Sequence, residues 1–170
     1  MATPPEVAPK PILDGRGAFA RVDGVALVLV NVQEWTDADA DQLFRETLEG
    51  GRPSAATLMH CPGAVPPAGV RRRLAELQKQ LEQTSGMTGG KLAVLIDSAV
   101  ARGAVTAWRW LTGGNVEAFA CSDVRSAFEW LDDSDLHTET RMARYRESLV
   151  LLQRAGPSLG APRNSSLAPS

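Results

Sequence analysis

Residues 25–32 read VALVLVNV, an apolar and largely β-branched run that only Asn31 interrupts. A strand without polar alternation is covered on both faces, which is typical of the centre of a parallel sheet in an α/β protein. The dipeptide Asp23-Gly24 comes directly before this run and favours a two-residue hairpin turn. We therefore expect the weakly alternating residues 18–22 to form an antiparallel neighbour of the central strand.

Strand patterns alternate with amphipathic helical patterns along the rest of the domain. Strands are predicted at residues 55–60, 92–96 and 116–119, and helices begin near residues 36, 67, 98 and 122. Strands that alternate with helices favour a mostly parallel sheet with right-handed crossovers. The sequence thus predicts an α/β fold with a mixed, mostly parallel sheet of about five strands.

The chain divides into four segments. Residues 1–14 are rich in proline and are expected to form a disordered leader, and residues 15–135 form the α/β domain. Residues 136–155 contain one further amphipathic helix, with apolar residues at spacings of three and four. Residues 156–170 are rich in Pro, Ser, Gly and Asn, and we expect a disordered tail.

Composition and charge exclude several classes of function. The formal net charge of −2 gives no indication of nucleic-acid binding. No apolar run approaches the roughly 20 residues that cross a bilayer, and the N-terminus lacks a signal-peptide pattern, so a cytoplasmic location is expected. In that compartment Cys61 and Cys121 are expected to be free thiols. Neither has a second cysteine or clustered histidines beside it, so no metal and no cofactor are predicted.

The stretch of residues 91–131 resembles a known family. It contains the segments KLAVLIDSAVARGAVTAWRWL, VEAFA and SAFEWL. These segments are similar to the SpoIIAA-like (anti-sigma-factor-antagonist-like) family, and the order of elements over residues 17–133 resembles the STAS fold. The positions that match the family's motifs are Asp97, Arg102-Gly103, Trp110-Leu111, Ala127 and Trp130-Leu131.

The resemblance implies a non-catalytic protein–protein interaction or regulatory module. Antagonist proteins of this kind have a phosphorylatable serine in the loop after the third strand. The matching residues 60–65 read HCPGAV and contain no hydroxyl group, so the usual phosphorylation switch is not expected there. The alternative is a small-ligand or lipid-binding protein, since related sheets hold apolar ligands under a helix.

His60-Cys61 and Asp97-Ser98 form a candidate cleft, because both pairs lie at strand ends, where α/β sheets place ligands. A thiolate beside an imidazole can act as a nucleophile, which makes an enzyme the third hypothesis. However, adjacent strand residues point to opposite faces, and no Asp or Asn motif orients the histidine. Asp97 is able to hold a cation, although helix capping needs only one side-chain oxygen. We therefore expect no enzymatic activity.

Arginines and a tryptophan form a candidate partner-binding surface. Three arginines lie in the first turns of one helix, where they oppose its dipole, although a solvated helix face also explains them. An exposed tryptophan flanked by arginine has the composition of a binding hot spot, unless another element covers it. These candidates are Arg71, Arg72, Arg73, Arg102, Arg109 and Trp110.

The C-terminal helix has a narrow apolar seam formed by Met142, Tyr145, Leu149 and Leu152. Such a seam is buried on its own domain, on a second copy of the chain or on another protein. These residues complete the candidate partner-binding set. A protein partner or self-association is therefore predicted, with a small ligand as the alternative.

Overall fold

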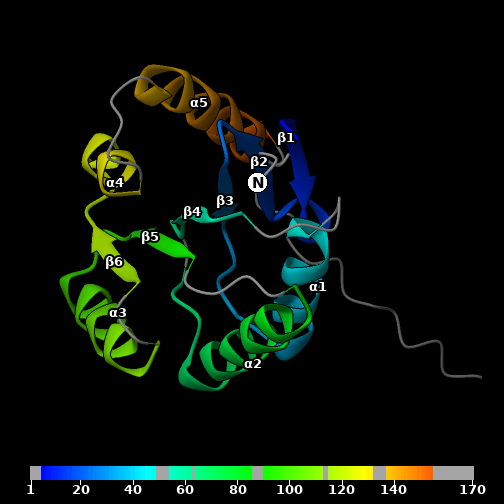
Figure 1. Ribbon diagram of the computed structural model, residues 1–170, viewed down its shortest axis with the longest axis vertical. Helices are drawn as coiled ribbons and strands as arrows, with labels where there is room; N and C mark the ends of the chain where they lie inside the picture. Colours follow the sequence, from blue (N-terminus) through cyan, green and yellow to red (C-terminus); the bar gives the residue numbers. More distant parts are fainter. Residues whose placement is uncertain are drawn as a thin grey trace, which may run out of the picture.

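The computed structural model describes residues 5–48, 54–62, 64–85, 90–112, 115–131 and 137–154. These residues form an α/β fold around a six-stranded sheet in the order β1-β2-β3-β4-β5-β6 (Figure 1). The first three strands pair antiparallel, and β3 to β6 pair parallel. The strands are β1 (Val7–Ile12), β2 (Gly17–Val22), β3 (Val25–Val30), β4 (Ala56–His60), β5 (Lys91–Leu95) and β6 (Val116–Phe119).

Helices lie on both faces of the sheet (Figure 1). Because β3 to β6 are neighbours in chain order, right-handed crossovers place the three connecting helices on the same face. On that face lie α1 (Asp37–Thr47), α2 (Ala68–Ser85) and α3 (Ala99–Thr112), and on the opposite face lie α4 (Val124–Leu131) and α5 (Thr138–Arg154).

The prediction that the central strand is buried on both faces is confirmed. All six residues of β3 are buried. Leu27 and Leu29 belong to the apolar cluster with α4 and α5, whereas Val28 and Val30 belong to the cluster with α1 and α2. The hairpin turn is confirmed as well. Asp23 and Gly24 have φ angles of 47° and 78°, the left-handed backbone that a two-residue turn requires.

The strand β1 corrects the expectation of a disordered leader through residue 14, and the sheet has six strands instead of about five. Pro9 and Pro11 concealed this strand, because proline normally interrupts a β-ladder. Here β1 is an edge strand, where a missing N–H group is tolerated. Pro9 also lies in the irregular stretch between Val7 and Lys10, where the register of pairing with β2 shifts.

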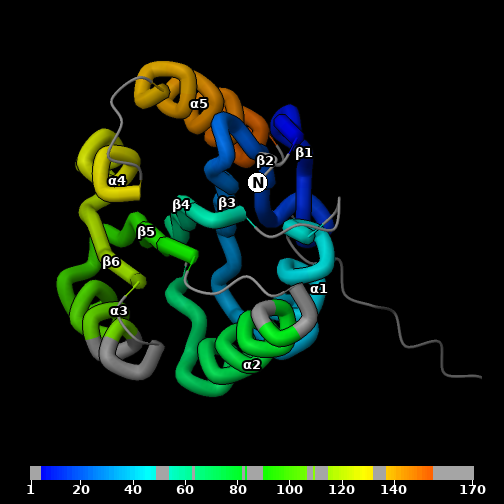
Figure 2. The backbone as a smooth tube through the Cα atoms, in the orientation of Figure 1, coloured from blue at the N-terminus to red at the C-terminus, as the bar shows by residue number. Residues whose placement is uncertain are grey.

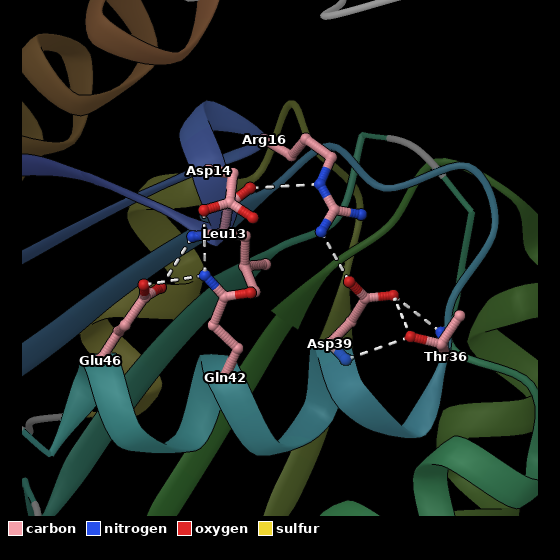
Figure 3. Close-up of polar contacts among 7 residues, drawn as sticks. All are labelled: Leu13, Asp14, Arg16, Thr36, Asp39, Gln42 and Glu46. Atoms are coloured by element: carbon pink, nitrogen blue, oxygen red, sulfur yellow. Dashed lines mark hydrogen bonds and ion pairs between the residues drawn. The ribbon is translucent and has the colours of Figure 1, made fainter. Parts of the chain in front are cut away.

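A polar network fastens α1 to the connection between β1 and β2 (Figure 3). Thr36 and Asp39 form a reciprocal capping box, and the Asp39 carboxylate also lies 2.6 Å from the Arg16 guanidinium. The connection, η1 (Leu13–Gly15), has three consecutive positive φ angles of 52°, 54° and 85°. The backbone N–H of Leu13 donates to Glu46 at 2.7 Å, so α1 holds this strained segment in place.

The expected helices are present, and α5 lies within the predicted residues 136–155. It lies across β1, β2 and β3 (Figures 1 and 2). The leader residues 1–4, the end of the predicted α/β domain at residues 132–135 and the predicted tail 156–170 lie outside the described residues.

We expect Gly17→Ala to lower the free energy of unfolding by about 1–3 kcal/mol, the usual cost of overpacking. A Cβ atom at Gly17 would lie 2.8 Å from Ile12 Cγ1 and 2.9 Å from the Leu29 carbonyl oxygen. The matched control is Gly103→Ala in α3, where a Cβ meets no atom within 4 Å and alanine favours the helix. Urea denaturation measures both variants, and a G17A chain as stable as wild type would contradict the packing described here.

Candidate functional site

His60 is the last residue of β4 and lies in register with Leu29 of β3 and Leu95 of β5. Its side chain is buried on the sheet face that α5 covers, and its Nδ1 atom lies 2.8 Å from the Tyr145 hydroxyl. The two rings are 5.8 Å apart at their centroids. The end of a central strand and a helix distant in sequence therefore meet at one hydrogen bond.

Two further polar residues complete this cluster at the carboxyl edge of the parallel strands. Cys121 follows β6, and its Sγ atom lies 3.4 Å from His60 Nε2. Asp97 follows β5, and its carboxylate accepts the backbone N–H of Cys121 at 3.1 Å. Tyr145, His60, Cys121 and Asp97 thus form a continuous chain of contacts that runs from the buried interior to the exposed Asp97.

The protonation states of the cluster disfavour nucleophilic chemistry. Burial lowers the pKa of His60, and the nearby Asp97 only partly opposes this shift. Burial, together with a hydrogen bond to Asp97, raises the pKa of the Cys121 thiol to about 11. Burial also raises the pKa of Tyr145. At neutral pH the histidine is therefore neutral and Cys121 is a thiol, which is a poor nucleophile.

The structure separates the predicted pair of His60 and Cys61. Cys61 is buried in the cluster with α1 and α2, on the opposite sheet face from His60, as the alternation along a strand predicts. Burial raises the pKa of the Cys61 thiol to about 12. The thiol near His60 is instead Cys121, which the sequence analysis did not single out. The sequence did contain a signal for Cys121. It lies just beyond the predicted strand β6, as Asp97 lies just beyond β5, so both are placed at the carboxyl edge of the sheet.

Asp97 and Ser98 have different roles at the start of α3. Ser98 Oγ accepts the backbone N–H of Ala101 at 3.3 Å and caps the helix. Asp97 instead binds the connection after β6 through Cys121. Among the residues that the structure describes, no group of three or more His, Cys, Asp or Glu side chains is arranged to hold a metal ion.

The three arginines of α2 do not form one free patch. Arg71 donates to the Pro66 carbonyl at 2.8 Å, and Arg73 lies 2.9 Å from the Asp41 carboxylate of α1. Arg72 is exposed. Two of the three side chains are therefore engaged within the chain, and only Arg73 joins α2 to another helix, so a binding role for this set stays a prediction.

The candidates on α3 also make contacts within the chain. Arg102 donates to the carbonyl groups of Ile96 and Asp97, and Arg109 lies 2.6 Å from the Glu117 carboxylate of β6. Trp110 lies on α3, but its side chain is outside the described part of the structure. These arginines attach α3 to the strands on either side of it.

The apolar seam of α5 faces the sheet of its own chain. Tyr145 and Leu152 are buried in the same cluster as β2 and β3, and the half-buried Met142 and Leu149 pack against that cluster. This arrangement corrects the assignment of the four residues to a partner-binding surface, because the sheet needs a cover on this face and α5 provides it.

A cavity of about 610 Å³ lies on the other face, between α1, α2 and the sheet. Apolar side chains of the sheet form its floor, including Val28, Met59 and Leu92. Leu43 and Phe44 of α1 and Leu74 and Leu81 of α2 line its walls. The exposed residues that line it, which we call the rim, are Gln78, Lys79, Gly90 and Asn115. The cavity is therefore apolar at its floor and polar at its rim.

The raised thiol pKa values predict slow, strongly pH-dependent alkylation. The rate at which iodoacetamide labels Cys121 is expected to rise about tenfold per pH unit between pH 7 and 10, because only the thiolate reacts. Peptide mass spectrometry distinguishes Cys121 from Cys61, which is buried and should stay unlabelled in the folded chain. A labelling rate for Cys121 that levels off near pH 8 would show an activated thiol.

Comparison of the chain with models of protein families, with curated proteins and with solved structures found no match. The six-stranded mixed sheet with helices on both faces is established by the structure itself. The resemblance to the STAS and SpoIIAA-like proteins stays a prediction from the segments within residues 91–131. In the ranges that the structure covers, no helix has the length and apolar character needed to cross a membrane.

Proposed function

We propose that this chain is a non-catalytic binding protein that holds a small, mainly apolar molecule in the cavity under α2. The observation that supports this function is the cavity of about 610 Å³. Pockets for small molecules typically measure about 300–1,000 Å³ and have mostly apolar walls with a few polar groups. The cavity meets both criteria.

The distribution of side chains in the cavity favours an amphiphilic ligand. The apolar floor and walls bury a hydrocarbon or ring system, which contributes roughly 25 cal/mol per Å² of apolar surface removed from water. Gln78, Lys79 and Asn115 make the exposed rim polar, and the Lys79 ammonium is a suitable donor to a polar end of the same molecule. A ligand with one polar end and an apolar body satisfies both regions.

Features of α5 and of the His60 cluster favour ligand binding over a protein–protein interaction module. The burial of Tyr145 and Leu152 removes the main argument for a partner on α5. The neutral His60 and the protonated Cys121 support a function without catalysis. We propose, as part of the same hypothesis, a cytoplasmic protein of STAS-like fold without the phosphorylation switch.

Filling the cavity tests the proposal. Ala75 of α2 lines the cavity, and Ala75→Trp is expected to weaken the binding of dodecanoate and 1-dodecanol at least tenfold, or about 1.4 kcal/mol. Native mass spectrometry of the delipidated full chain, followed by titration calorimetry, measures binding of both probes. Circular dichroism checks that the variant folds.

The matched control is Ala68→Trp, which introduces the same side chain at an exposed position in the first turn of the same helix. This variant should bind both probes as the wild-type chain does. Equal affinity of A75W and wild type, or no binding of either probe by the wild-type chain, would rule out this cavity as the binding site.

A further inference from the structure

The surface with which α5 docks on the sheet combines apolar side chains with buried polar groups, since Met142, Leu149 and Leu151 also pack against the apolar cluster. Its five buried residues are Thr138, Arg141, Tyr145, Ser148 and Leu152, and Leu152 is the sole aliphatic side chain among them. Amphipathic helices normally dock with an apolar stripe. Since α5 is held by apolar and polar contacts together, the loss of a buried polar contact makes its local opening easier.

The contact between Tyr145 and His60 joins α5 to the interior of the sheet. Tyr145 OH and His60 Nδ1 are 2.8 Å apart and buried. Arg141 donates to the Asp23 carbonyl at 3.0 Å, at the hairpin turn, and Ser148 Oγ donates to a carbonyl of α5 itself. The Tyr145–His60 pair therefore ties the middle of α5 to a central strand.

We propose that the His60–Tyr145 hydrogen bond is an acid-sensitive latch, so that protonation of His60 weakens the docking of α5 and exposes the sheet face beneath it. Because a phenol is a stronger donor than a thiol, we assign the neutral imidazole the tautomer in which Nδ1 accepts the Tyr145 O–H and Nε2–H points toward Cys121. A protonated imidazole has no acceptor nitrogen, so the buried Tyr145 O–H loses its acceptor and has to rotate away from the new Nδ1–H.

The surroundings of His60 do not compensate for a positive charge. Leu29 and Leu95 are its register neighbours on β3 and β5. Among the residues that the structure describes, the titratable groups that face it are Tyr145 from α5, Cys121 from the connection after β6, and Asp97 from the connection after β5. Tyr145 and Cys121 are uncharged at neutral pH, and Asp97 is exposed, so solvent screens its attraction.

The direction of the effect follows from the lowered pKa of His60 in the folded chain. The unfolded chain, in which histidine titrates near a pKa of about 6.5, binds the proton more tightly. The stability that neutral His60 contributes is therefore complete above pH about 6.5 and is lost as the pH falls toward the lowered pKa. The same reasoning applies to local opening of α5, which exposes His60 to water.

Hydrogen exchange of the full chain between pH 5.0 and 7.5 tests the latch. After correction for the pH dependence of chemical exchange, the protection factors of the α5 amides should fall on acidification more than those of the β3 amides. Because one proton is involved, the α5 protection factors should fall by at most about tenfold per pH unit. His60→Gln, which does not titrate, should remove this pH dependence. Equal responses of α5 and β3 in the wild-type chain, or a pH dependence that persists in H60Q, would overturn the proposal.

The second histidine supplies the matched control, because the chain contains only two. His137 precedes α5 and lies 3.5 Å from the Asp23 carboxylate, so its neighbour is an acidic group of the hairpin turn instead of Tyr145. His137→Gln should retain the acid response of the wild-type chain. If H60Q does not fold, Tyr145→Phe provides the test. This variant should lower the hydrogen-exchange protection of α5 at pH 7.5 and reduce the pH dependence of that protection. A Y145F chain with the same protection as wild type at every pH would refute the latch.

Discussion

The burial of β3 on both faces is the constraint that organises this molecule. A strand that is apolar on each side has to be shielded from water twice, so helices are needed above and below the sheet. The crossover helices α1, α2 and α3 shield one side, because parallel neighbours in chain order place them together. The other side would be bare without α4 and α5, which explains why the C-terminal helix belongs to the domain.

The two faces of the sheet differ in how their helices pack on it. Under α1 and α2 the side chains are apolar, but the helices leave a space of about 610 Å³ above the sheet. Under α5 the helix lies close to the sheet, and its contacts include buried polar groups such as Arg141 and the His60–Tyr145 pair. The loosely filled face is suited to bind a small molecule, whereas the face under α5 contains a buried histidine that is suited to respond to protons.

Local patterns in the sequence predicted local features of the fold. The turn at Asp23-Gly24, the strand β6 and the helix α5 follow from backbone preferences and periodicity, which act over a few residues. The strand β1 was missed because its prolines act differently at an edge than in a sheet interior. The His60–Tyr145 contact joins residues 85 positions apart, and no local pattern states where α5 lies across the sheet. The cavity likewise depends on how closely two helices approach the strands.

The prolines of β1 also affect how this chain meets other copies of itself. An exposed edge strand offers unpaired backbone groups to which a neighbouring molecule adds its own strand, and such pairing starts aggregation. Pro9 and Pro11 remove two donors from this edge, and the bulge near Pro9 breaks its regularity. The opposite edge, β6, is only four residues long. Both ends of the sheet are thus poor templates for growth of a fibril, even though the core between them is rich in β-branched residues.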